Sequence, residues 1–184
     1  KNYEWYFRTQ HGHCGTKMHC FRWRGRSKHH TLTSGLDDYP RSDLPDEREL
    51  HVDLASWMAF ASKVMMKYAQ LTGNNADYEH YYKNLKKISN MIETVHWDEE
   101  SGYYSDVIMT ETGTRHIRQF GYVSIYPLLF GIANPTRARI VLERVSKELM
   151  TDYGLRSLSP SSEYYMKGDE YWTGPIWINI NYLF

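Results

Sequence analysis

Residues 53–95 read DLASWMAFASKVMMKYAQLTGNNADYEHYYKNLKKISNMIETV. In residues 53–71 the apolar side chains recur every three or four positions, which is the period of a helix with one buried face. Residues 77–95 repeat this spacing. Gly73-Asn74-Asn75 is typical of a helix end, and Asp77 is expected to cap the second helix. The stretch therefore predicts two long antiparallel helices joined by a short loop.

The segments that flank this hairpin have other patterns. Residues 1–50 are dense in Gly, His, Arg and Pro and show no sustained helical period. They are predicted to be an irregular segment, and long segments of this kind are often functional. Residues 97–116 carry β-forming side chains between two glycines, and predict a small β-hairpin or a long loop.

The remaining third of the chain returns to helical spacing. Helices are predicted over residues 122–132 and 135–150, the second of them opened by Asn134-Pro135. A loop at residues 154–168 precedes a last helix, which is expected to open at Thr173-Gly174-Pro175. The predicted fold class is all-α, with long loops and a small β-hairpin. Helix pairs that alternate with loops suit part of a toroid with its loops gathered at one mouth.

Composition excludes several classes of protein. The 184 residues suggest roughly one domain, and 22 Lys+Arg balance 22 Asp+Glu. This balance argues against a nucleic-acid partner, because neutralising phosphates needs a surplus of basic residues. A 41% hydrophobic fraction with 6 Phe, 6 Trp and 16 Tyr rules out a disordered chain. No apolar run approaches the roughly 18 residues that cross a bilayer.

The two ends indicate a piece of a longer protein. The sequence starts at Lys1, without Met or a signal peptide, and stops at Phe184 inside an apolar run. Residues 1–184 are therefore expected to be a partial domain that is truncated at both ends. Cys14 and Cys20 are the only cysteines, and the sequence leaves open whether they pair or stay reduced.

Residues 34–41, SGLDDYPR, form the first candidate site. Two adjacent carboxylates lie in a Gly- and Pro-bounded turn beside an aromatic ring and a guanidinium. Such neighbours can separate the pKa values of Asp37 and Asp38, as acid–base catalysis requires. The alternative is a solvated Asx-type turn, which has a similar composition.

Three further segments concentrate carboxylates and aromatic rings. Glu49 and Asp53 are four residues apart and would share one helix face, although a helix dipole alone also favours acidic residues there. Residues 97–106, WDEESGYYSD, and 170–177, EYWTGPIW, place aromatic rings beside carboxylates. Sugar rings pack on aromatic planes and their hydroxyls need charged partners, but a surface hairpin and buried tryptophans would look the same.

Metal and cofactor sites are not predicted. The cluster His11, His13, Cys14, His19 and Cys20 lacks the spacing of a zinc site. No P-loop, dinucleotide fingerprint or nucleophile elbow is present. We expect no metal and no cofactor.

Taken together, these segments resemble the processing α-glucosidases, or mannosyl-oligosaccharide glucosidases, of glycoside hydrolase family 63. The resemblance covers nearly the whole chain in the order of the family. It runs through FRWRGR at residues 21–26, SGLDDYPR at 34–41, ELHVDLASW at 49–57, FGYVS at 120–124, GLRSLS at 154–159 and YWTGPIWIN at 171–179.

The resemblance implies a partial catalytic domain with an (α/α)6 toroid, in which residues 1–50 form an active-site loop segment. It implies an inverting exo-α-glucosidase that removes the terminal α-1,2-linked glucose from the triglucosylated N-glycan precursor. The partner would be the glucosylated N-glycan on nascent glycoproteins, in the lumen of the endoplasmic reticulum. The parent protein would be membrane-anchored outside these residues.

The same resemblance assigns roles to individual residues. Asp37 matches the general acid, Glu49 and Asp53 match the acidic pair of the substrate-binding segment, and Asp106 matches a further acidic residue near the site. Other residues are expected to line the pocket. They are Trp23, Arg24, Tyr39, Arg41, Tyr171, Trp172 and Trp177.

The sequence also departs from the family pattern. Ala55-Ser56 replaces Arg-Cys, and Thr173 replaces an arginine that could bind a substrate hydroxyl. The family's general base is a glutamate well beyond the Trp-x-Gly-Pro-x-Trp motif, so we expect it beyond Phe184 and expect residues 1–184 alone to be inactive. Two alternatives remain, a trehalase-like (α/α)6 glycosidase and a non-catalytic sugar-binding pseudoenzyme.

Overall fold

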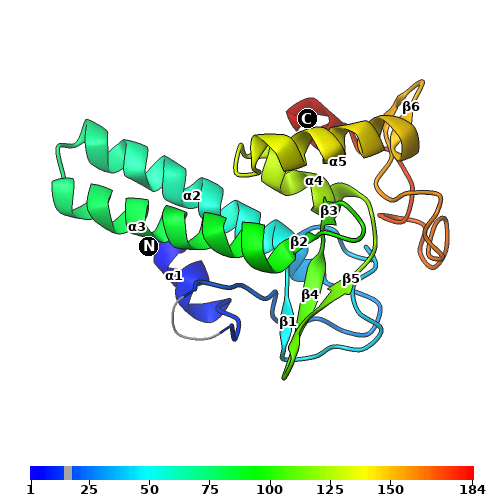
Figure 1. The fold of residues 1–184 in the computed structure, drawn as a ribbon, viewed down its shortest axis with the longest axis horizontal. Coiled ribbons are helices and arrows are strands. Elements are labelled where there is room, and N and C mark those ends of the chain that lie inside the picture. Colours follow the sequence, from blue (N-terminus) through cyan, green and yellow to red (C-terminus); the bar gives the residue numbers. More distant parts are fainter. Residues whose placement is uncertain (15–17) are drawn as a thin grey trace.

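A computed structural model describes residues 1–14 and 18–184. Its longest elements are the antiparallel helices α2 (Val52–Leu71) and α3 (Asn75–Met91), which project together from one end of the molecule (Figure 1). The predicted helical hairpin is thus confirmed. A π-helical turn, η2 (Ile92–His96), continues α3, so the helical segment includes residue 95, where the second helix was expected to end.

The cap of α3 differs from the prediction. The side chain of Asn74 accepts a hydrogen bond from the backbone N–H of Asp77, at 3.1 Å. Asn74 is therefore the N-cap, and Asp77 lies inside the first turn. The prediction that Asp77 caps this helix was wrong, because Asn74 already has the non-helical backbone and the side-chain oxygen that a cap requires.

Within residues 1–14 and 18–184, three small antiparallel sheets accompany the helices, so the fold is not purely helical. The largest has the strand order β1 (Glu49–Leu50), β4 (Asp106–Thr110), β5 (Gly113–Ile117). The others pair β2 (Trp97–Asp98) with β3 (Tyr103–Tyr104), and β6 (Met150–Thr151) with β7 (Gly154–Leu155). The region predicted as one small hairpin therefore forms two.

The helices that follow β5 in sequence gather at the opposite end from the free end of the α2–α3 hairpin (Figure 1). They are α4 (Tyr122–Leu129), α5 (Pro135–Glu148) and α6 (Ile178–Leu183). Asn134 caps α5 as predicted, accepting from the N–H of Thr136 at 2.9 Å. The last helix begins at Ile178 and not directly at Thr173-Gly174-Pro175.

The described part of the segment predicted to be irregular contains the helix α1 (Asn2–Thr9) and the 3-10 turn η1 (Leu32–Ser34). Buried Tyr3 attaches α1 to the hairpin: its hydroxyl lies 2.9 Å from Ser62 Oγ and accepts from Asn84 at 3.1 Å. Isolated helices this short are marginal, so tertiary packing decides whether they form. The periodicity of the sequence did not predict α1.

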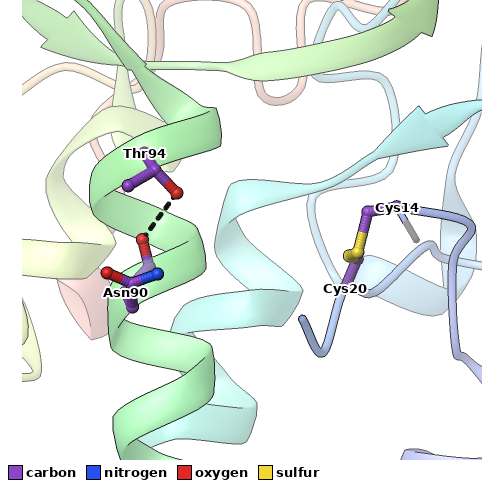
Figure 2. Close-up of a disulfide and its surroundings, with 4 residues drawn as sticks. All are labelled: Cys14, Cys20, Asn90 and Thr94. Atoms are coloured by element: carbon purple, nitrogen blue, oxygen red, sulfur yellow. Dashed lines mark hydrogen bonds between the residues drawn. A yellow bond between two sulfur atoms is a disulfide. The ribbon is translucent and has the colours of Figure 1, made fainter. Parts of the chain in front are cut away.

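The two cysteines, whose state the sequence left open, form a disulfide between Cys14 and Cys20. Figure 2 shows this bond, and on α3–η2 the hydrogen bond that Thr94 Oγ1 donates to the carbonyl of Asn90 at 2.8 Å. Over residues 1–14 and 18–184, no helix combines the length and the apolar character needed to cross a membrane.

Candidate active site

A cleft of about 640 Å³ opens where three loops meet. The first loop runs from Arg26 to Thr31, the second from Asp38 to Asp43, and the third contributes Tyr164, Lys167, Gly168, Asp169 and Thr173. Arg41 lies on both this cleft and a smaller one of about 150 Å³. The second half of the predicted SGLDDYPR motif, residues 38–41, thus forms one wall of the main cleft.

The loop that carries the two adjacent carboxylates follows η1 and is fixed by its backbone. The N–H of Thr31 donates to the carbonyl of Asp37 at 2.7 Å. The carboxylate of Asp38 accepts from two successive N–H groups, those of Tyr171 at 3.0 Å and Trp172 at 2.6 Å. The two carboxylates therefore differ: among the described residues, the Asp37 carboxyl has no hydrogen-bond partner, whereas both oxygens of Asp38 are occupied.

Behind the cleft lies a buried ionic cluster centred on Arg41. Its guanidinium donates to Asp53 at 2.7 and 3.2 Å and to Asp106 at 2.6 Å. All three side chains are at most 5% exposed. The two carboxylates raise the pKa of Arg41 against the effect of burial, so the guanidinium stays charged.

Asp106 also caps α2 from a distance. Its second carboxylate oxygen accepts from the N–H of Val52 at 2.8 Å. The pairing of β1 with β4, with Glu49 opposite Ile108, brings Asp106 beside the start of the helix. A carboxylate is favourable there because the first N–H groups of a helix lack backbone partners.

Glu49 forms a second buried pair. Its carboxylate accepts from the hydroxyl of Ser42 and lies 3.3 Å from a guanidinium nitrogen of Arg26. Burial raises the pKa of Glu49, partly opposed by the Ser42 hydrogen bond and by Arg26. Arg26 lines the cleft and Glu49 does not, so Glu49 can affect the cleft by holding Arg26.

His51 connects this pair to the tryptophan of the FRWRGR segment. Its Nδ1 accepts from the N–H of Trp23 at 2.9 Å, and its Nε2 lies 3.8 Å from Glu49. Burial holds the pKa of His51 well below its ordinary value, so the ring is neutral with the proton on Nε2. Trp23 in turn donates from Nε1 to Asp53 at 3.1 Å.

The aromatic rings near the C-terminal end form a packed set. Trp172 and Trp177 stack with centroids 3.9 Å apart and planes 10° apart. Tyr171 meets Trp177 edge-on at 4.6 Å, and its carbonyl accepts from the Trp177 indole at 2.9 Å. Trp172 is buried, whereas Tyr171 is 48% exposed.

The structure therefore separates the predicted site residues into groups. Tyr39 and Arg41 line the cleft, and Asp37 directly precedes cleft-lining Asp38. The residues behind the cleft wall are Trp23, Glu49, Asp53 and Asp106, all buried. The aromatic set Tyr171, Trp172 and Trp177 does not line the cleft, although Thr173 between its members does. Arg24 points elsewhere, donating to the carbonyl of His11 at 2.7 Å.

Several cleft residues were not predicted as site residues, among them Arg26, His30 and Asp169, and the anchoring role of Asp38 was not predicted. His30 and Asp169 face each other across the cleft at 2.6 Å. Asp38 stood beside Asp37 in the motif, and its distinct role depends on backbone groups 133 and 134 residues away. Among the described residues, no three His, Cys, Asp or Glu side chains are arranged to hold a metal ion.

Comparison with known proteins places this geometry in a family context. The profile of the "Glycosyl hydrolase family 63 C-terminal domain" matches residues 1–184. A probable mannosyl-oligosaccharide glucosidase of Schizosaccharomyces pombe is 37% identical over the whole chain and 24% of its own length. A mannosyl-oligosaccharide glucosidase of Saccharomyces cerevisiae is 35% identical over 91% of the chain and 21% of its own length. The chain thus spans about a quarter of these relatives.

Solved structures show the same fold at lower identity. A family 63 mannosylglycerate hydrolase from Thermus thermophilus, in complex with glucose, matches with a TM-score of 0.61 at 23% identity. The match covers 73% of this chain and 31% of that one. A neutral trehalase from Saccharomyces cerevisiae matches with a TM-score of 0.54 at 18% identity, over 72% of this chain and 24% of the trehalase.

Proposed function

The chain belongs to glycoside hydrolase family 63, and we propose that it forms part of the catalytic domain of an inverting exo-α-glucosidase. Its substrate would be the triglucosylated N-glycan precursor, from which it removes the terminal α-1,2-linked glucose. The curated relatives named as mannosyl-oligosaccharide glucosidases support this choice. The complete (α/α)6 toroid would be assembled with the rest of the parent protein.

The observation that carries the proposal is the contrast between the two adjacent carboxylates. Asp38 is committed to two backbone N–H groups, whereas the Asp37 carboxyl has no hydrogen-bond partner among the described residues. A general acid needs a proton that is available to the substrate and a loop that is rigid. The loop of Asp37 is rigid, because the Asp37 carbonyl and the Asp38 carboxylate are both anchored, and the Asp37 carboxyl makes no hydrogen bond to the described residues that would hold it away from a substrate.

In the proposed reaction, Asp37 protonates the glycosidic oxygen while water attacks the anomeric carbon from the opposite face. A carboxylate on that face takes the proton from the water, and the configuration at the anomeric carbon inverts. We assign this base to a glutamate of the parent protein beyond Phe184. On this proposal, residues 1–184 by themselves do not turn over substrate.

The buried acidic residues take supporting roles in this proposal. Asp53 and Asp106 hold the buried Arg41 guanidinium behind the cleft wall, and Glu49 does the same for Arg26. Truncating any of them would weaken substrate binding through the arginine that it holds. The stacked tryptophans would support the wall formed by Thr173.

We place the activity in the lumen of the endoplasmic reticulum, where the glycan of nascent glycoproteins would be the partner. A membrane anchor of the parent protein would lie outside these residues. The names of the relatives support this placement, since they denote glucosidases that act on mannosyl-oligosaccharides.

The test is Asp37→Asn in the intact parent protein. We expect turnover of a triglucosylated oligosaccharide to fall by a factor on the order of 10² or more, because general acid catalysis contributes about 10²–10⁴-fold, while glycan binding persists. Asp43→Asn is the control: Asp43 lines the cleft close to the loop of Asp37, but it is exposed, and among the described residues its side chain accepts only a 3.3 Å bond from Tyr164. Equal turnover by wild type and Asp37→Asn would exclude Asp37 as the acid.

The same assay separates the alternatives. A trehalase-like glycosidase would prefer trehalose in a substrate panel, and the fold shared with the neutral trehalase is the reason to include it. A sugar-binding pseudoenzyme would bind the oligosaccharide without turnover. The pseudoenzyme is considered because Thr173 replaces the family's arginine, which could bind a substrate hydroxyl.

A further inference from the structure

Asp38 bridges two parts of the chain that lie 133 and 134 residues apart in sequence. Its Oδ2 accepts from the N–H of Tyr171 at 3.0 Å, and its Oδ1 accepts from the N–H of Trp172 at 2.6 Å. Hydrogen bonds to an ionised acceptor are stronger than those between neutral groups. One side chain therefore ties the loop of Asp37 to the aromatic motif.

The backbone that Asp38 binds is held in an unfavourable conformation. Glu170, the residue before Tyr171, has a left-handed φ of +53°. This region is unfavourable for a residue with a Cβ atom, and such residues persist only where their surroundings enforce them. Left-handed residues turn successive N–H groups toward one point, which makes a nest for an anion.

We propose that Asp38 is a positioning residue, whose carboxylate fills this nest and thereby fixes the aromatic motif against the loop of the general acid. The inference rests on the proposed function, in which Asp37 is that acid. Asp38 acts through the backbone of Tyr171 and Trp172, so its effect on catalysis is indirect.

Loss of the Asp38 carboxylate would affect the cleft in two ways. Trp172 stacks on Trp177 at 3.9 Å, so a shift of the Trp172 backbone separates the two indoles. Thr173 follows directly, lines the cleft and donates from Oγ1 to the carbonyl of Lys167 at 3.1 Å. Without Asp38, the stacked pair and this wall of the cleft each lose one of the contacts that hold them in place.

The experiment compares variants of the intact parent protein in kinetics and in near-ultraviolet circular dichroism. Asp38→Ala is expected to lower kcat/KM about 10- to 100-fold, since small displacements in an active site have effects of this size. Asp38→Asn keeps one carbonyl acceptor and should recover part of the loss. The exciton signal of the stacked tryptophans should be lost in Asp38→Ala and should be retained in part in Asp38→Asn.

A second substitution distinguishes positioning from a general loss of stability. Glycine tolerates the left-handed conformation, so Glu170→Gly should keep the nest open without Asp38 and recover about fivefold of the activity lost in Asp38→Ala. Met166→Gly is the matched control, because Met166 also has a left-handed φ, +52°, but its N–H donates to the carbonyl of Thr173. Met166→Gly should recover none of the activity lost in Asp38→Ala.

Equal recovery by the two glycine variants would overturn the proposal, as would an unchanged tryptophan signal in Asp38→Ala. The dichroism needs no substrate and therefore does not depend on the proposed function. Full turnover in Asp37→Asn would refute the assignment of the acid, while the response of the tryptophan signal to Asp38 would still decide whether Asp38 holds the motif.

Discussion

Arg41 is a single residue on which much of the structure of the candidate site depends. It is the only positive partner within hydrogen-bond distance of both Asp53 and Asp106 among the described residues, and all three are buried. Removing one partner of a buried ion pair leaves uncompensated charge, which is far more damaging than loss of an exposed pair. The cluster therefore makes the wall of the cleft depend on a single guanidinium.

Replacing Arg41 by methionine should destabilise the domain by about 3–5 kcal/mol, because two buried carboxylates lose their counter-ion. Urea unfolding of the variant in the parent protein measures this. The control is Arg48→Met, which removes an exposed pair with Asp46 at 2.5 Å, where Arg48 is 62% exposed, and should change the stability much less, because solvent screens exposed ion pairs. Similar losses in both variants would show that the buried cluster is not stabilising the fold.

The contact between His30 and Asp169 predicts a pH dependence. The hydrogen bond that His30 donates to the Asp169 carboxylate raises the pKa of His30 above its ordinary value, with smaller contributions from the charges of Asp169, Asp38 and Asp37. Since the folded-state pKa is raised, the contact is fully favourable below pH of about 6.5. It is lost as the pH rises through the raised pKa.

Titration of His30 by NMR checks this prediction. Asp169→Asn should lower the pKa of His30 toward its ordinary value, whereas Glu170→Gln, which removes the charge on the next residue, should change it little. An unchanged His30 titration in Asp169→Asn would mean that the two loops are not in contact across the cleft in solution.

At the scale of elements, the α2–α3 hairpin depends on its short connection. The Asn74 side chain caps α3 by accepting from the N–H of Asp77. Asn74→Ala should destabilise the hairpin by about 1 kcal/mol, the usual effect of losing such a cap. Asn75→Ala is the control, because Asn75 is the exposed first residue of α3 and alanine is favourable there. Thermal unfolding of both variants measures the difference, and equal stability would locate the cap elsewhere.

Periodicity predicted the long elements and missed the short ones. The α2–α3 hairpin, the start of α5 and the strands after Trp97 follow from spacing and caps that lie within one segment. Helix α1 and strand β1 have too few residues to show a period, and each forms because it meets a distant partner. Tyr3 packs on the hairpin, and Glu49 pairs with Ile108 across the sheet.

The candidate site divides in the same way. The SGLDDYPR motif was predicted as a site, and its second half, residues 38–41, lines the cleft. The partners of its residues were not predictable from the sequence, because Arg41 meets Asp106 across 65 positions and Asp38 meets Trp172 across 134. Spacing carries no information on such pairs. It also could not show that Glu49 and Asp53 would be buried behind arginines.

At the scale of the whole molecule, α2 has one face that the described residues leave uncovered. Near its start, Trp57 and Phe60 contact Phe130, with centroids 4.5 and 4.8 Å apart. Farther along the same face, Val64, Tyr68 and Leu71 are exposed, and Tyr68 is 62% exposed. In Figure 1 this end of α2 has only α3 beside it. An apolar stripe at helical spacing is typical of a face that packs against another helix.

If the parent protein completes the proposed toroid, a helix from outside these residues should cover this stripe. Tyr68→Ala in the intact parent should then destabilise it by about 2 kcal/mol or more, as the loss of a buried aromatic side chain does. Lys67→Ala, the exposed neighbour on the same helix, should stay within about 0.5 kcal/mol of wild type. Should Tyr68→Ala also stay in that narrow range, the stripe faces solvent in the parent, and the ring of helices does not close against α2.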